Sequence, residues 1–144
     1  MRSITYFAVC VVLLLWGLGG ASIYVAYFIE TPEEFALAAE TAENRDAYAA
    51  YVAHIPLWAI GVGTIAAVAR LAGAIALLLR RAWALPLYIV SLAFFLVALF
   101  RAFVLADVAS VMSEGHIAIE VVFLVLSVFA TWFAYVHKST GVLK

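Results

Sequence analysis

The sequence predicts an all-α membrane protein built as a four-helix transmembrane bundle. Of its 144 residues, 69% are hydrophobic and only 12% are charged, whereas a soluble domain is about half apolar and a quarter charged. Four apolar blocks are each long enough to cross a bilayer, which takes about 20 helical residues. They cover residues 4–28, 56–79, 82–106 and 116–136. Because they fill most of the chain, we expect a single transmembrane domain over residues 1–144.

The first block loosely resembles a secretory signal peptide. Arg2 precedes an apolar run, and small residues follow near Gly19. However, the apolar core of a signal peptide spans only about 7–15 residues, and here apolar character continues to Phe28. We therefore expect an uncleaved first transmembrane helix.

The distribution of basic residues predicts the orientation. Basic side chains flank the spans on one side of the membrane and are almost missing from the other side, which holds Arg45 alone and is otherwise acidic. Positive charge is retained in the cytoplasm, so both termini are expected there. The residues on that side are Arg2, Arg80, Arg81, Lys138 and Lys144.

The extracytoplasmic segment 31–55 has helical signals of its own. Thr31, Pro32 and Glu34 form the pattern of a helix start with a capping box. The sequence around Asn44 indicates a break, after which Asp46 is placed to cap a second short helix. This predicts an amphipathic interfacial helix or a helical hairpin between spans one and two.

The second of these short helices has one apolar and aromatic face, formed by Tyr48, Tyr51, Val52 and Ile55. Such a face either lies on the membrane surface or covers the end of the bundle. Tyrosine and tryptophan favour the membrane interface. The expected interface anchors are Tyr48, Tyr51, Trp58, Trp83 and Trp132.

Small residues predict where helices pack closely. The very short connection at Arg80 and Arg81 makes spans two and three antiparallel neighbours. Small side chains at intervals of three and four allow close approach of helix backbones in lipid. Span two carries them at Gly63, Ala66, Ala67, Gly73 and Ala74, with Arg70 in the same stripe, and span one carries them at Gly17, Gly19 and Gly20. These two faces are predicted to form a tight helix pair.

Three ionisable residues lie inside the predicted spans. From a rise of about 1.5 Å per residue, Arg70 lies about 15 Å from the cytoplasmic edge, and Arg101 and Glu120 lie about 6–9 Å from the outer edge. Arg101 and Glu120 share a level and are expected to pair. Arg70 has no carboxylate at its level, so its predicted partners are Ser91, Ser127, backbone carbonyls or the face of Trp16.

Two interpretations of these charges stay open. In one, Arg70, Arg101 and Glu120 line an outward-facing polar cavity together with His116, Asp107 and His54, and the excess positive charge suits an anionic or polar ligand. In the other, an internal ion pair fixes the bundle and Arg70 reaches toward the interface. Intramembrane charges usually mark functional sites because they are costly to insert.

Several classes of site are disfavoured by the sequence. His116 and Glu120 share a helical face, but only His54, Asp107 or Glu114 could complete a metal site, and no established metal motif is present. Cys10 is the single cysteine. We expect no metal, no cofactor, no catalytic residue and, without a basic surface, no nucleic-acid partner.

A group of motifs resembles a known family. Pro56-Leu57-Trp58 precedes span two, Leu15-Trp16-Gly17 lies in span one, and the run from Leu77 through Arg80-Arg81 and Trp83 to Pro86 and Ser91-Leu92 joins spans two and three. Together they are similar to a family of small four-helix bacterial inner-membrane proteins often labelled "sugar transporter". The resemblance implies the fold and the location, and it supplies no catalytic residues.

Three functional hypotheses follow. The first is a non-enzymatic membrane protein that binds or transports a small polar or anionic solute, as a homo-oligomer surrounded by membrane lipids. The second is an accessory or assembly subunit of a larger membrane complex, docked through its small-residue faces. The third is a small enzyme acting on lipid or quinone, with His116 and Glu120 as its acid–base pair.

Overall fold

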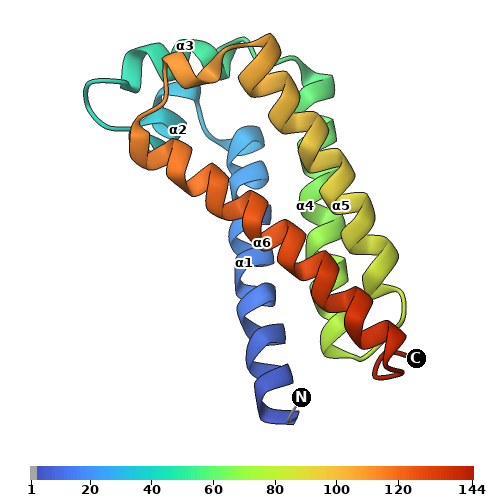
Figure 1. Ribbon diagram of the computed structural model, residues 1–144. Helices are drawn as coiled ribbons and strands as arrows, with labels where there is room; N and C mark the ends of the chain where they lie inside the picture. The colour runs from blue at the N-terminus through green and yellow to red at the C-terminus, as the bar shows by residue number, and fades with distance from the viewer. Residues whose placement is uncertain (1–2) are drawn as a thin grey trace.

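The computed structural model describes residues 3–144, and this part of the chain is helical without strands. Figure 1 shows the elements in order. They are α1 (Ser3–Ile29), α2 (Pro32–Ala39), α3 (Arg45–Ala53), α4 (Leu57–Leu78), α5 (Ala84–Phe100), the π-helical turn η1 (Arg101–Leu105), the 3-10 turn η2 (Val108–Ser110) and α6 (Glu114–Ser139).

The predicted fold class is confirmed. Four helices are long and apolar enough to cross a membrane: α1, α4, α5 with its η1 extension, and α6. Their ends lie within a few residues of the predicted spans. The chain therefore has the architecture of a multi-pass membrane protein. Arg2, used in predicting the orientation, lies outside the described residues.

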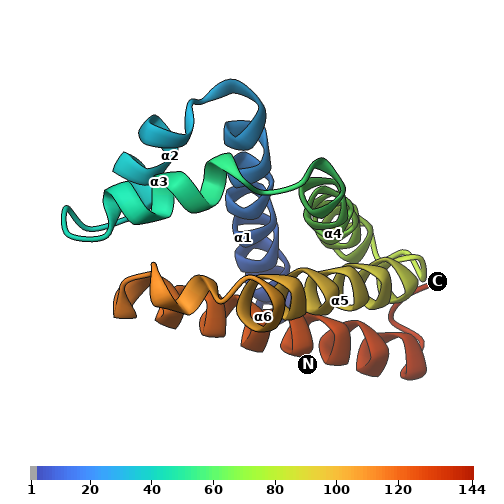
Figure 2. The ribbon, with the colours of Figure 1, turned by 90° about the horizontal axis from the view of Figure 1, so that it is seen from above.

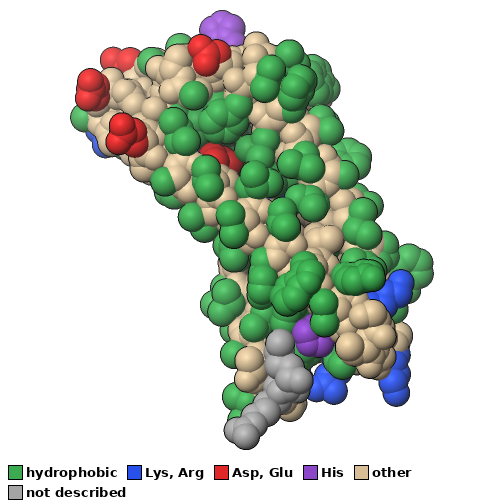
Figure 3. Space-filling view, viewed as in Figure 1, with side chains coloured by type: hydrophobic (Ala, Val, Ile, Leu, Met, Phe, Trp, Pro, Cys, Tyr) green, Lys and Arg blue, Asp and Glu red, His purple; other side chains and the backbone are tan. Residues whose placement is uncertain are grey.

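The two short helices lie across one end of the bundle, and the chain ends lie at the other (Figures 1 and 2). In the bundle, α4 packs against both α5 and α1, and α6 packs against α5. Figure 3 shows acidic side chains gathered at the α2–α3 end and basic side chains at the opposite end. The surface between them is mostly hydrophobic, as expected for a lipid-facing belt.

Segment 31–55 begins as predicted and differs at its second helix. Thr31 and Glu34 form the reciprocal hydrogen bonds of a capping box. The second helix starts at Arg45 with Asn44 in the capping position, so the prediction that Asp46 caps it is wrong. Asp46 lies in the first turn instead, where its charge favours the helix N-terminus.

The chain end is tied to the turn between α4 and α5. Lys144 donates its amide proton to the Arg80 carbonyl and accepts from the Ala82 amide, both at about 3 Å. Arg80 takes a left-handed backbone conformation, with φ 54°, to make this turn. Leu143 is buried against the core as a result.

One cluster of buried side chains closes the end of the bundle near the termini. Tyr6, Cys10 and Leu13 of α1 contact Leu77 of α4 and Phe133 of α6. The Tyr6 hydroxyl donates to the Leu77 carbonyl. Because side chains fill this end of the bundle, a cavity can form in the other half, near α2 and α3.

Glycines of α4 and α1 make room for side chains and for a close helix contact. A Cβ on Gly17 would lie 3.4 Å from Leu71 Cα, so α1 and α4 approach closely there. A Cβ on Gly63 would overlap the Tyr24 ring, and one on Gly73 would lie 3.3 Å from the Tyr88 ring. The small-residue stripe of α4 therefore receives aromatic rings from α1 and α5 at these two positions.

We predict that Gly63→Ala destabilises the protein, because the added methyl group displaces the Tyr24 ring. Overpacking of this kind costs about 1–3 kcal/mol. Gly61→Ala is the matched control: it lies on the same helix, and a Cβ there meets nothing within 4 Å. Thermal unfolding in detergent, followed by circular dichroism, should show a lower midpoint for Gly63→Ala only. Equal midpoints for both variants would contradict the packing described here.

Candidate functional site

A cavity of about 540 Å³ lies in the half of the bundle near α2 and α3. Side chains from α1, α4 and α6 form its walls, and Phe35 of α2 and Tyr48 of α3 lie at the end near the short helices. Its polar lining consists of Ser22, Tyr24, Tyr27, Glu30, Arg70, His116 and Glu120. The volume falls within the usual range for small-molecule sites.

Arg70 is the most unusual member of this lining. It is only 3% exposed. Its guanidinium carbon lies 4.4 Å from the centre of the Trp16 ring, 5.1 Å from that of Phe95 and 5.7 Å from that of Phe123. The guanidinium also packs on Gly20, where a Cβ would lie 2.9 Å from one of its terminal nitrogens. Gly20 thus provides the space that Arg70 occupies.

The Arg70 guanidinium makes no ion pair within the described residues, although Glu120 lines the same cavity. No carboxylate among residues 3–144 lies within 4.0 Å of the guanidinium, and Nε has no hydrogen-bond partner. Placing an arginine at the centre of a membrane helix costs about 2.5–3.5 kcal/mol on insertion scales. The aromatic rings return about 0.5–2 kcal/mol. Arg70 is therefore a desolvated cation that borders a cavity.

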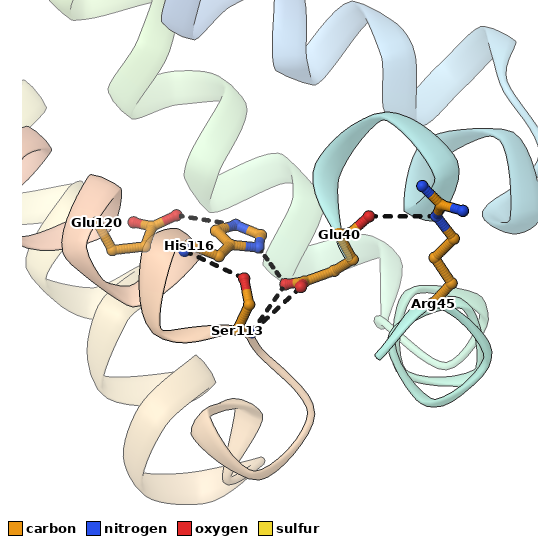
Figure 4. A network of polar contacts seen from close by, with 5 residues as sticks. All are labelled: Glu40, Arg45, Ser113, His116 and Glu120. Carbon is orange, nitrogen blue, oxygen red and sulfur yellow. Dashed lines mark hydrogen bonds and ion pairs between the residues drawn. The ribbon is translucent and has the colours of Figure 1, made fainter. Parts of the chain in front are cut away.

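A second polar group joins α2 to α6 (Figure 4). The carboxylate of Glu40, the residue that ends α2, accepts hydrogen bonds from the Ser113 amide at 3.1 Å and from His116 Nδ1 at 2.5 Å. His116 Nε2 in turn lies 4.0 Å from Glu120 Oε1. Since an ionised carboxylate can only accept, the Nδ1 proton is directed to Glu40 and Nε2 is turned toward Glu120.

The Glu40 carboxyl is ionised in this setting. Burial raises its pKa, but the hydrogen bonds from His116 and Ser113 outweigh burial and hold the pKa below its ordinary value of 4.5. Arg45 contributes only a hydrogen bond from Nε to the Glu40 backbone carbonyl. No sequence pattern indicated this group, because Glu40 lies 76 residues from His116 and is one of several acidic residues in its segment.

Arg101 and Glu120 do not form the predicted ion pair. Arg101 donates to the Tyr51 hydroxyl at 3.2 Å instead, and its guanidinium lies over the Tyr51 ring. A π-helical turn begins at Arg101, the residue whose side chain turns toward Tyr51 and away from Glu120. Arg101 and Glu120 both line a smaller neighbouring cavity of about 100 Å³, which Tyr24, Tyr27, Tyr48 and Tyr51 surround.

The structure separates the other predicted site residues. Arg70, His116 and Glu120 line the larger cavity, and Arg101 and Glu120 line the smaller one. His54 and Asp107 are exposed and are not among the lining residues of either cavity. His54 bonds to the Ala50 carbonyl at the end of α3.

The aromatic residues predicted as interface anchors divide into two groups. Trp58, Trp83 and Trp132 are exposed, as an anchor must be. Tyr48 is 4% exposed and packs between α2 and α6, against Phe35 and His116, so it covers the bundle rather than the lipid interface. The sequence left two positions possible for the aromatic face of α3, on the membrane surface or over the end of the bundle. In the structure this face lies over the end of the bundle.

Within residues 3–144 no group of three His, Cys, Asp or Glu side chains is arranged to hold a metal ion. Compared with protein-family models, with curated proteins and with solved structures, the chain shows no match to any of them. The function must therefore be argued from the geometry of the cavity itself.

We predict that Glu40→Gln removes an acid-sensitive part of the stability. Since the folded pKa of Glu40 lies below the unfolded value, its contribution is complete above about pH 4.5 and is lost as the pH falls through the folded pKa. The free energy of unfolding of the wild type should fall over this acidic range. That of Glu40→Gln should be about 1–3 kcal/mol lower at pH 7 and should fall less as the pH is lowered. Unfolding in detergent between pH 7 and pH 3 measures this. Glu43→Gln, at an exposed position of the same segment, is the control, and an identical pH profile for Glu40→Gln would contradict the assignment.

Proposed function

We propose that this protein is a bacterial inner-membrane protein that binds a small ligand with an anionic or strongly polar group in the cavity between α1, α4 and α6. The observation that carries the proposal is the state of Arg70. A guanidinium that is 97% buried (3% exposed), lacks a carboxylate partner and borders a cavity of about 540 Å³ is placed to receive a negative group from a ligand.

The other polar groups suit recognition of a defined ligand. His116 is held in one orientation by Glu40, and its Nε2 edge lies near Glu120 in the cavity lining. Tyr24 and Tyr27 add hydroxyl groups and aromatic surface. A mostly apolar site with a few fixed polar groups is the usual composition of a small-molecule pocket.

Transport of the bound ligand across the membrane would be a second step after binding. The cluster around Tyr6 and Leu77 fills the bundle on the other side of Arg70. One protomer in this conformation therefore holds a ligand without offering it a continuous path. Movement across the membrane would require a rearrangement of the helices or further copies in an oligomer.

The alternative, an accessory subunit, has less support. It requires small-residue faces that are free to dock, but Tyr24 covers Gly63 and Tyr88 covers Gly73 within the chain. The enzymatic alternative has an oriented histidine but no nucleophile beside it in the cavity lining.

The proposed orientation has both termini in the cytoplasm. Arg80, Arg81, Lys138 and Lys144 belong to the basic end of the molecule, opposite the acidic α2–α3 end (Figure 3). This distribution supports cytoplasmic retention of the basic end. Membership of the four-helix family with the "sugar transporter" label is part of the same proposal.

We predict that Arg70→Met abolishes ligand binding without lowering the stability of the ligand-free protein. A methionine fills similar space without the desolvated charge, so the free energy of unfolding should stay constant or rise by about 1 kcal/mol. Native mass spectrometry of protein extracted in mild detergent should show a small-molecule adduct on wild type and none on Arg70→Met. Thermal unfolding of the delipidated protein gives the second readout.

Arg81→Gln is the control for this experiment, because Arg81 is exposed and lies at the other end of the bundle. It should keep the adduct. Loss of stability in Arg70→Met with an unchanged adduct would assign Arg70 a structural role and contradict the proposed function.

A further inference from the structure

Aromatic side chains cover part of the cavity on the side of α2 and α3. Phe35 of α2 and Tyr48 of α3 are buried and line the cavity at this end. Tyr27, Phe35 and Tyr48 form a continuous stack, with ring centres 4.4 Å and 6.3 Å apart. Glu40 holds this cover to α6 through Ser113 and His116. This aromatic cover narrows the approach from water, and Glu30 and Ala38 are exposed lining residues beside it.

Toward the middle of the membrane, aromatic rings lie around Arg70. Arg70 is stacked on Trp16 there, and the Trp16 ring lies 5.8 Å from the Phe123 ring. Phe95 lies on the remaining side of the guanidinium. This layer holds the positive charge at the inner end of the cavity.

Within the spans, exposed residues of the lining lie on α1 and α6. Ser22 and Ile23 of α1 and Ile119 of α6 line the cavity and are also exposed at the surface. Ile23 lies six residues before the end of α1 and Ile119 five residues after the start of α6, which places both about 8–9 Å inside the spans. This opening, which we call the α1–α6 mouth, faces acyl chains.

Resting on the proposed function, we propose that the ligand is a membrane amphiphile with a single apolar chain and an anionic head group, and that it reaches Arg70 sideways from the outer leaflet through the α1–α6 mouth. The head group pairs with the Arg70 guanidinium, and the chain leaves between Ile23 and Ile119. The apolar rim suits the chain, and the Arg70 guanidinium, which makes no ion pair among residues 3–144, suits the head.

Charge at the outer rim favours this path over one from water. Glu30 is exposed and belongs to the lining near the membrane surface. Its carboxylate repels a free anion that approaches along the interface. An amphiphile already dissolved in the leaflet meets the mouth at the depth of the two isoleucines and passes below Glu30.

The test uses Trp16 as a reporter, since its ring touches the Arg70 guanidinium. Replacing Trp58, Trp83 and Trp132 by Phe, all three being exposed, leaves Trp16 as the single tryptophan. The protein is placed in phosphatidylcholine nanodiscs and titrated with dodecyl phosphate or butyl phosphate, which share a head group and differ in chain length. Empty nanodiscs correct for partitioning into lipid. A saturable change in Trp16 emission reports binding.

The proposal predicts saturable binding of dodecyl phosphate, at least about a hundredfold tighter than butyl phosphate because the longer chain buries more apolar surface. The mouth-blocking pair Ile23→Phe and Ile119→Phe should weaken binding at least about tenfold. The control pair Val12→Phe and Val125→Phe changes exposed positions of the same helices outside the cavity lining and should leave binding unchanged. The pair Ile23→Ala and Ile119→Ala widens the mouth and should speed association. Because this effect is opposite to that of the Phe pair, it distinguishes a blocked mouth from a misfolded variant.

Different outcomes would contradict the lateral entry of an amphiphile and the binding of an anionic group by Arg70. Equal binding of butyl phosphate, or no effect of either mouth pair, would overturn the lateral path and the amphiphile while leaving an anion site at Arg70. Unchanged binding of both phosphates in Arg70→Met would overturn the proposed function as well.

Discussion

The structure depends on how a bilayer protein accommodates a charged group that makes no ion pair among residues 3–144. In water an arginine is solvated at no cost, but in hydrocarbon each unpaired polar group costs several kcal/mol. Arg70 lies deep within α4, and the bundle surrounds it with three aromatic rings and makes space for it at Gly20. The neighbouring cavity is the remaining source of compensation. A ligand with a negative group would complete the ion pair that the sequence leaves open.

A second constraint concerns the short helices. Segment 31–55 packs its aromatic face on the bundle end, and the hydrogen bond between Glu40 and His116 holds it to α6. The same contact orients His116 toward the cavity. One interaction therefore holds the aromatic cover over this end of the cavity and sets the position of one of the cavity's polar groups.

Sequence reasoning predicted the fold in detail because lipid imposes simple rules. Length and hydropathy gave the four spans, and the capping box at Thr31 gave the start of α2. The intramembrane charges were recognisable for the same reason, and one of the partners considered for Arg70, the Trp16 face, is the one that lies beside it. Depth along a helix, however, does not fix direction around it. Arg101 shares a level with Glu120 and still turns to Tyr51.

The role of Glu40 was not predictable from the sequence. Its contact with His116 joins residues far apart in the chain, and it depends on where α2 ends and how the segment folds over the bundle. The exposure of His54 and Asp107 depends on the same loop geometry, which helix periodicity does not determine. Inside the spans, depth and charge were enough to identify the site residues but not all of their partners, and at the bundle end tertiary contacts decide both.

The most direct test of this account is an experimental density map of the protein extracted together with its native lipids. The account predicts continuous density in the cavity, with a polar end at hydrogen-bond distance from the Arg70 guanidinium and an apolar end between Ile23 and Ile119. A map in which a carboxylate of the chain itself, such as Glu120, pairs directly with Arg70 and the cavity is closed by side chains would contradict it.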